Sequence, residues 1–365
     1  MAEIDKYFIA LQKNEGSDLH LAAGSPPMIR VHGTITPLKA PPLEGEMIDR
    51  MLEEIQSEHT RQEFLEGGDA DWAYELAGVA RFRCNAFRDR KGPGAVFRII
   101  PNDFLTAEQL NIPESILNLC KLSKGLVLVT GPTGSGKSTT LTAMIDFINR
   151  TRKEHVITIE DPIEFVHENK KCLINQREVH SHTKSFSRAL RAALREDPDI
   201  VLVGEMRDLE TTHIAIETAE TGHLVFGTLH TTTAASTVDR IIDQFPADSQ
   251  AQIRTMLSTS LKGVVAQTLC KKKPKGRLAA MEILIVTSAI ANLIREGKTF
   301  QIPSAMQVGG REGMVLLNDT LFRYVMEGLV EPEEALAKSV NRKELAIKLQ
   351  GKGINVDGIK VDDDH

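Results

Sequence analysis

The chain has 365 residues and a formal net charge of −6, from 44 lysines and arginines against 50 aspartates and glutamates. Apolar residues make up 41% and charged residues 26%, which is ordinary for globular proteins and excludes large-scale disorder. The acidic balance disfavours a general nucleic-acid binder and a DNA translocase, and the length predicts two domains.

Residues 1–101 show the pattern of a small α+β domain. Ile4, Tyr7, Phe8 and Leu11 follow the i, i+3, i+4, i+7 spacing of a helix with one buried face. A second helix is expected over 43–55, and strands over 18–22, 28–32, 34–36, 81–87 and 95–100. Residues 102–120 are expected to be a linker that begins after Pro101.

Residues 121–350 change character, because apolar strands now alternate with helical segments as in a parallel sheet. The strands are expected over 125–130, 155–159, 200–203 and 224–226, and their unbroken apolar runs suit burial on both faces. The stretch 248–340 reads as mostly helical, interrupted by a hairpin over 264–270 and 278–286. The predicted fold class is therefore α/β, with a helical C-terminal part and a flexible tail over 351–365.

Features of membrane and disulfide-rich proteins are missing from the sequence. No apolar run approaches the ~18 residues of a membrane helix, and the N-terminus lacks the basic start of a signal peptide. The cysteines Cys84, Cys120, Cys172 and Cys270 form no C-x-x-C pair, which argues against a zinc ribbon or a disulfide framework. We therefore expect a soluble cytoplasmic protein without a transmembrane segment.

A phosphate-binding loop is predicted at Gly131-Pro-Thr-Gly-Ser-Gly-Lys-Ser138, which fits the pattern G-x-x-x-x-G-K-[ST]. A buried strand precedes it and a helix over 139–150 follows it, which is the context that this motif requires. Lys137 is expected to reach the β- and γ-phosphates of ATP, and the Ser138 hydroxyl to bind Mg²⁺. The alternative is a glycine-rich turn without a ligand. The residues expected to bind the nucleotide are Gly131, Pro132, Thr133, Gly134, Ser135, Gly136, Lys137, Ser138 and Thr139.

Acidic residues follow two of the later strands, where an open parallel sheet binds its ligands. Glu205 comes directly after the apolar strand 200–203 and Gly204, as a Walker B carboxylate that holds Mg²⁺ would; the alternative is a cap for the helix that starts near Asp208. Glu160, Asp161 and Glu164 follow the strand 155–159, and three clustered carboxylates suit a cation or water activation. Their alternative role is capping of a turn or helix.

Two histidines and two arginines complete the candidate site. His223 and His230 flank one strand, and His230 is expected beside the γ-phosphate; the alternative for each is a structural histidine. Arg81 and Arg83 are expected on one face of a strand, where they suit recognition of a γ-phosphate in a neighbouring or closed site. The alternative for this pair is a salt bridge to surface carboxylates.

These motifs together resemble those of the secretion-type ATPases, and in particular the PilT family of type IV pilus retraction motors. Residues 131–139, 158–167, 200–207 and 219–230 resemble the family's Walker A motif, Asp box, Walker B motif and His box, in that order. The resemblance extends over nearly the whole chain. It is also supported outside these motifs by Ser17-Asp-Leu-His-Leu21 and Pro26-Pro-Met-Ile-Arg30.

The resemblance implies an N-terminal PAS-like domain and a RecA-like P-loop ATPase domain in a homohexamer. It implies ATP hydrolysis with Mg²⁺ that powers pilus retraction and twitching motility. It also implies peripheral association with the inner membrane through the pilus platform protein, and a paralogous ATPase as a further partner. The family favours the glutamate matching Glu164 as general base, and Glu205 matches its Walker B glutamate, so both residues stay open for that role.

One motif departs from the family. Family members usually read Ala-Ile-Arg-Asn-Leu-Ile-Arg-Glu in a segment tied to retraction, and this chain has Ala291 in place of the first arginine. This keeps open a nucleotide-binding accessory ring with low turnover. The remaining alternative is a related assembly or secretion ATPase, which the short N-terminal part and the missing tetracysteine segment disfavour.

Overall fold

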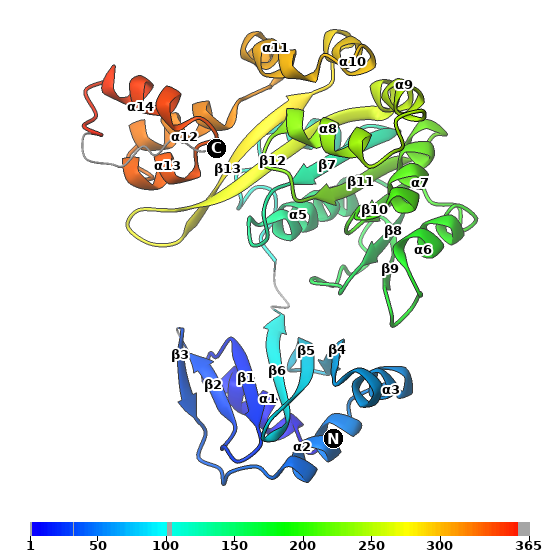
Figure 1. The fold of residues 1–365 in the computed structure, drawn as a ribbon, viewed down its shortest axis with the longest axis vertical. Coiled ribbons are helices and arrows are strands. Elements are labelled where there is room, and N and C mark those ends of the chain that lie inside the picture. Colours follow the sequence, from blue (N-terminus) through cyan, green and yellow to red (C-terminus); the bar gives the residue numbers. More distant parts are fainter. Residues whose placement is uncertain (1, 32, 101–103, 357–365) are drawn as a thin grey trace. The chain divides into compact units, whose positions relative to one another are not determined.

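The computed structural model describes residues 2–31, 33–100 and 104–356, and contacts divide the chain into two units (Figure 1). The first unit comprises Met1–Phe104, Pro162–Val166 and Glu178–His182. The second comprises Leu105–Asp161, His167–Arg177 and Thr183–His365. The boundary predicted after residue 101 falls within 101–103, outside the described residues.

The first unit is built on a six-stranded antiparallel sheet with the strand order β3-β2-β1-β6-β5-β4. Its strands are β1 (Asp18–Ala22), β2 (Met28–Val31), β3 (Thr34–Pro37), β4 (Asp69–Leu76), β5 (Ala80–Asp89) and β6 (Gly92–Ile100). Its helices are α1 (Asp5–Lys13), α2 (Gly45–Glu53) and α3 (Glu58–Gly67). The predicted face of the first helix is confirmed, because Ile4, Tyr7, Phe8 and Leu11 are all buried. The Phe8 ring stacks on Phe82 with centroids 4.0 Å apart.

Two elements of this unit, α3 and β4, have no counterpart among the predicted elements. β4 is an edge strand that buries Ala70 and Trp72 and exposes the alternating Asp69 and Asp71. Aspartate is depleted in strands, so the exposed acidic residues concealed the alternation in the sequence. His32, at the turn of the predicted hairpin, lies outside the described residues.

The second unit is built on a seven-stranded sheet with the order β13-β12-β7-β11-β10-β8-β9 (Figure 1). Its strands are β7 (Gly125–Thr130), β8 (His155–Glu160), β9 (Leu173–Glu178), β10 (Ile200–Val203), β11 (Leu224–Leu229), β12 (Leu261–Lys271) and β13 (Arg277–Ile285). The four predicted parallel strands are confirmed as β7, β8, β10 and β11. Every residue of β7, β10 and β11 is buried, as their unbroken apolar runs require. β9 was not predicted.

The predicted hairpin is also confirmed, since β12 runs parallel to β7 and pairs antiparallel with β13. Figure 1 shows this hairpin in yellow, next to the C-terminal helices α12 to α14. The helices of this unit are α4 (Glu114–Leu119), α5 (Lys137–Thr151), α6 (Phe186–Ala193), α7 (Leu209–Glu220), α8 (Ala234–Asp243), α9 (Gln250–Ser260), α10 (Ser288–Arg295), α11 (Ile302–Val308), α12 (Leu317–Met326), α13 (Pro332–Lys338) and α14 (Arg342–Gln350).

The structure differs from the predicted linker and tail where it describes them. The expected linker 102–120 contains α4, and Ile116, Leu119 and Cys120 are buried in the core of the second unit. The expected flexible tail 351–365 is packed up to Val356, which is buried among the C-terminal helices. Burial of apolar side chains packs both stretches, although the polar residues of the first and the glycines of the second resemble a loop. Residues 357–365 lie outside the described residues.

None of the helices within the described ranges is both long enough and apolar enough to cross a bilayer.

Candidate functional site

The loop between β7 and α5 has a backbone that favours glycine at three positions. Gly131 has φ 145°, Gly134 has φ 77° and Gly136 has φ 88°. A Cβ atom on Gly131 would overlap the carbonyl oxygen of Gln267 and the Oγ atom of Ser135. The loop therefore forms a tight cradle in which peptide N–H groups can approach an anion without side chains intervening.

The N-terminus of α5 adds positive partial charge to this cradle. Gly136 is the N-cap of this 15-residue helix and has no side chain with which to cap the first N–H groups. The Lys137 ammonium folds over the loop and donates to the carbonyl oxygens of Gly131, at 2.7 Å, and Pro132, at 3.2 Å. Helix dipole, backbone donors and a lysine together form a site for phosphate groups.

Parallel pairing brings the ends of the neighbouring strands to the same edge of the sheet as this loop. Leu229 pairs with Thr130, and Val203 pairs with both Gly227 and Ile159. The residues that follow these positions, among them His230 and Glu205, therefore lie along the carboxyl edge, where open parallel sheets bind ligands.

Glu205 is the best-defined carboxylate at this edge. Its Oε1 atom accepts hydrogen bonds from His230 Nε2 at 2.8 Å and from Arg207 Nε at 2.5 Å. Burial alone would raise the pKa of Glu205, but the hydrogen bonds and charges of Arg207 and His230 outweigh it and lower the pKa. Glu205 is therefore an ionised acceptor held between two cationic or donor groups.

The close approach of β10 to β8 explains the glycine before Glu205. A Cβ atom on Gly204 would lie 3.0 Å from the Ile159 carbonyl oxygen, so a side chain there would push the two strand ends apart.

At the end of β8, Glu160 Oε1 accepts from Thr158 Oγ1 at 2.5 Å and from Gln176 Nε2 at 3.1 Å. Polar partners in its own strand and in the neighbouring strand β9 therefore hold Glu160 in place.

Asp161 and Glu164 are both exposed, but they belong to different units. The negative charge of Asp161 helps to raise the pKa of Arg207, after the larger effect of the Glu205 hydrogen bond. Glu164 lies in Pro162–Val166, which belongs to the first unit by its contacts. The structure therefore brings Asp161 near the Glu205 cluster and leaves the part played by Glu164 as a prediction.

His223 lies at the opposite end of its strand from His230. The two histidines flank the six residues of β11, so seven steps of roughly 3.3 Å separate them by about 23 Å. His223 Nδ1 lies 3.2 Å from the carbonyl oxygen of Thr218, beside the start of the sheet. The expectation that His223 lies at the catalytic edge is therefore wrong, and its structural alternative describes the geometry.

Arg81 and Arg83 lie on the same face of β5, because Phe82 and Cys84 between and beside them are buried. Arg81 forms an ion pair with Glu178, within the first unit, and so does not present a free guanidinium to a γ-phosphate. Arg83 is exposed. Arg81 therefore forms a salt bridge, as the alternative expects, although its partner Glu178 is buried and not a surface carboxylate. The role of Arg83 stays a prediction.

Two contacts at the edge were not predicted from the sequence. Arg207 contacts Glu205, whereas the neighbouring Asp208 caps α7 by accepting from the Thr211 N–H at 2.8 Å. The other contact is made by Gln267, whose Nε2 atom donates to the Ser135 carbonyl at 2.8 Å. A polar residue inside the apolar run 264–270 was the available signal for Gln267.

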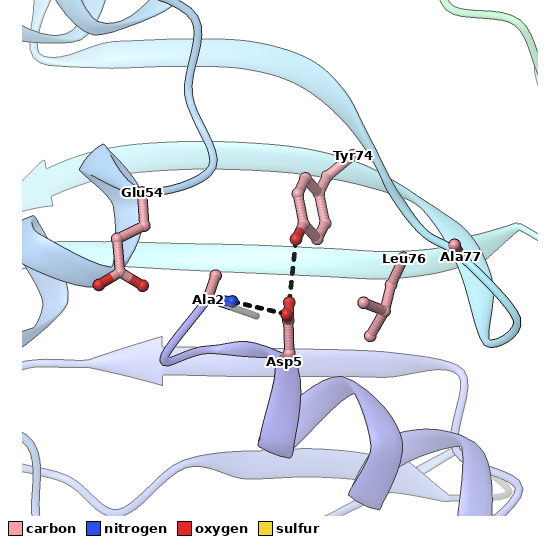
Figure 2. A pocket seen from close by; sticks show the side chains of 6 residues that line it. All are labelled: Ala2, Asp5, Glu54, Tyr74, Leu76 and Ala77. Atoms are coloured by element: carbon pink, nitrogen blue, oxygen red, sulfur yellow. Dashed lines mark hydrogen bonds between the residues drawn. The ribbon is translucent and has the colours of Figure 1, made fainter.

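A separate cavity of about 620 Å³ lies in the first unit and brings none of the predicted site residues together (Figure 2). Asp5 is buried there and accepts from the Ala2 N–H at 2.7 Å and from the Tyr74 hydroxyl at 3.0 Å. Burial, then the hydrogen bond to Asp5, raises the pKa of Tyr74 to about 12, so the phenol remains a donor. These groups fix the start of α1 to β4.

The fold and the site define a nucleotide-binding protein of the P-loop class. The chain matches the family described as Type II/IV secretion system protein over residues 77–337. Since this match covers more than half of the chain, the chain belongs to that family.

Individual relatives agree with this assignment. The chain is 56% identical over 327 residues to the "Type IV pilus retractation ATPase PilT" of Pseudomonas aeruginosa, covering 90% of this chain and 95% of that protein. It is 51% identical to the "Twitching motility protein" of Neisseria gonorrhoeae, covering 88% of this chain and 86% of that protein. A crystal structure of the pilus retraction motor PilT with bound ADP matches with a TM-score of 0.86 at 48% identity, covering 94% of this chain and 97% of that one.

Proposed function

We propose that this chain is a motor ATPase that hydrolyses ATP to power retraction of type IV pili. The observation that carries the proposal is the Glu205–His230 pair, held on the same sheet edge as the glycine loop and Lys137. A phosphate cradle alone binds nucleotide, whereas hydrolysis also needs a fixed carboxylate and a polar partner beside the phosphates. The relatives named for pilus retraction and twitching motility supply the direction of the work.

The chemistry assigns a role to each part of the edge. The N–H groups of 131–139 and the Lys137 ammonium bind the phosphates, and Ser138 and Glu205 would hold Mg²⁺, which supplies charge neutralisation when bound. The loop suits such a ligand, because its tight conformation depends on glycine: a Cβ atom on Gly131 would overlap the Gln267 carbonyl oxygen and displace the loop. Glu205 or Glu164 orients or deprotonates the attacking water, and His230 keeps the Glu205 carboxylate in position.

The proposal extends to the assembly that the motor needs. We propose a homohexamer at the cytoplasmic side of the inner membrane, in contact with the pilus platform protein and a paralogous ATPase. Arg83 is the proposed arginine that reaches the γ-phosphate of a neighbouring subunit, because it is exposed on β5. Normal ATP hydrolysis by Arg83→Ala would exclude this role for Arg83.

The experiment is steady-state ATP hydrolysis by the purified protein over a range of protein concentrations. Lys137→Ala and Glu205→Gln are compared with the matched surface changes Lys153→Ala and Glu210→Gln. The proposal expects the first two changes to lower turnover by at least about 100-fold and the second two to leave it within twofold. A steep rise of turnover with concentration would support sites completed by neighbouring subunits.

A second candidate function is a nucleotide-binding accessory ring with low turnover, and Ala291 is the observation that favours it. ADP binding without turnover by the wild-type protein would support this alternative. Ala291→Arg then tests the retraction segment, because Ala291 lies partly exposed on α10 and an arginine can be accommodated there. Pilus retraction that improves in this variant at unchanged ATP hydrolysis would assign the segment to force transmission.

A further inference from the structure

Gln267 is a buried polar residue in the middle of an apolar strand. It is 2% exposed and lies in β12, where Val264, Val265 and Ala266 precede it and are also buried. Placing an amide among apolar side chains costs free energy unless the amide is hydrogen-bonded. Its presence therefore calls for a specific partner.

That partner is the phosphate-binding loop. Gln267 Nε2 donates to the Ser135 carbonyl oxygen at 2.8 Å, and both groups are buried. The same residue touches the loop at both ends. A Cβ atom on Gly136 would lie 3.2 Å from Nε2, and one on Gly131 would overlap the Gln267 carbonyl oxygen. The phosphate-binding loop therefore packs directly against β12.

The contact also leaves polar atoms unmatched. Within the described part of the chain, Gln267 Oε1 and Ser135 Oγ are buried and have no hydrogen-bond partner. An unmatched buried polar atom is destabilising, and such atoms collect where function requires them. The Gln267 amide therefore contributes through the one hydrogen bond that its nitrogen makes to Ser135, and not through a gain in overall stability.

We propose that Gln267 is a positioning residue that holds the loop 131–138 in the conformation that accepts nucleotide phosphates. The proposal rests on the proposed nucleotide-dependent function, and it concerns a residue outside the Walker A, Walker B, Asp box and His box segments. Gln267 acts through the Ser135 carbonyl, whose position fixes the direction of the N–H groups on either side. Loss of this hydrogen bond would therefore change nucleotide affinity more than the rate of the chemical step.

The test uses a pH-dependent replacement. In Gln267→Glu, the protonated carboxylic acid can donate to the Ser135 carbonyl, whereas the carboxylate cannot. Buried glutamates have pKa values raised to as much as about 8–9, so the acid form persists at about pH 6 and is lost near about pH 9. Gln267→Met removes the donor at every pH, and Thr268→Val changes the next residue of β12 as a matched control.

ADP affinity of the full chain is measured by calorimetry at both pH values, with KM and kcat for ATP at the lower one. We expect Gln267→Met to weaken ADP binding about fivefold at both pH values and to raise KM more than it lowers kcat. We expect Gln267→Glu to bind within about twofold of wild type at the lower pH and at least about tenfold weaker at the higher pH. Thr268→Val should bind as wild type does.

The outcomes separate this inference from the proposed function. If the wild-type chain binds no ADP, the proposed function fails. If the wild-type chain binds ADP and both Gln267 variants bind equally well at both pH values, Gln267 does not position the loop. Thermal unfolding of each variant is recorded alongside. A lowered melting temperature with unchanged ADP affinity would make the contact a matter of stability alone and would overturn the inference.

Discussion

His230 Nε2 donates a hydrogen bond of 2.8 Å to Glu205 Oε1, across the ends of the adjacent strands β11 and β10. The same oxygen accepts from Arg207, so two donors compete for one carboxylate oxygen. His230 directly follows a fully buried strand and its side chain is 48% exposed, whereas the Arg207 side chain is 72% exposed. The histidine is therefore the partner that defines where the carboxylate points.

Replacing His230 by alanine should reduce turnover without abolishing nucleotide binding. Without His230, the exposed Arg207 alone orients Glu205, and misplacement of a catalytic carboxylate costs rate. We expect kcat to fall about 10- to 100-fold, with ADP affinity within about threefold of wild type. The matched control is His223→Ala, at the opposite end of β11, which should keep kcat within about twofold. Equal losses from both changes would remove His230 from the mechanism.

Removing Arg207 should shift the acid limb of the rate profile upward in pH. Hydrogen bonding and charge from Arg207 help to hold the pKa of Glu205 below its usual value, against the opposing effect of burial. In Arg207→Ala the pKa of Glu205 therefore rises, and the carboxylate is protonated at a higher pH than in the wild type. The pH dependence of kcat/KM measures this shift, and Arg191→Ala, which breaks the exposed ion pair with Glu210, is the control. An unchanged acid limb would mean that Glu205 does not limit the rate there.

The sequence predicted the centre of the second unit better than its edges. The apolar runs of β7, β8, β10 and β11 are long enough to predict buried parallel strands. The glycine-rich motif between β7 and α5 likewise predicts the phosphate-binding loop. The rule that ligands lie at carboxyl ends already favours His230, which follows its strand, over His223, which precedes it. Applying that rule to both histidines would have excluded His223.

The missed features depend on contacts between distant segments. Arg81 pairs with a carboxylate 97 residues away, and Gln267 reaches a carbonyl 132 residues away. No local pattern encodes such partners, because strand order in a sheet is set by packing of the whole domain. The packing of 104–120 and of 351–356 was missed for a similar reason, since their apolar side chains find their partners only in the folded core.

His167 should make the protein less stable as the pH falls below neutrality. Burial lowers its pKa from 6.5 to about 4, so the folded state favours the neutral ring. The resulting stability is present above the unfolded pKa and is lost as the pH falls from about 6.5 through about 4. We expect the free energy of unfolding to drop by about 1–2 kcal/mol more in the wild type than in His167→Gln between about pH 6.5 and pH 5.

Urea denaturation at a series of pH values measures this difference. His59→Gln, at an exposed position of α3, is the control and should follow the wild-type pH dependence. If wild type and His167→Gln lose stability in parallel over this range, burial of His167 does not contribute to acid sensitivity.

Removing the Glu282 carboxylate should strongly destabilise the second unit. It is 6% exposed on β13, and its two oxygens accept from the first N–H groups of two helices, Ala234 of α8 at 2.8 Å and Leu317 of α12 at 3.2 Å. Glu282→Ala leaves both buried donors without an acceptor, so we expect the free energy of unfolding to fall by about 2–4 kcal/mol. Glu220→Ala, at an exposed end of α7, should change it by less than about 0.5 kcal/mol.

The pH dependence of the same variant provides a second check. Burial raises the pKa of Glu282 above 4.5, against the opposing effect of the two N–H groups, so the folded state holds its proton more tightly than the unfolded chain does. The corresponding stability is present below about pH 4.5 and is lost as the pH rises through the folded-state pKa. The difference in unfolding free energy between wild type and Glu282→Ala should therefore shrink as the pH rises from this value. A difference that grows with pH would mean that the two helix N-termini stabilise the ionised carboxylate more than burial opposes it.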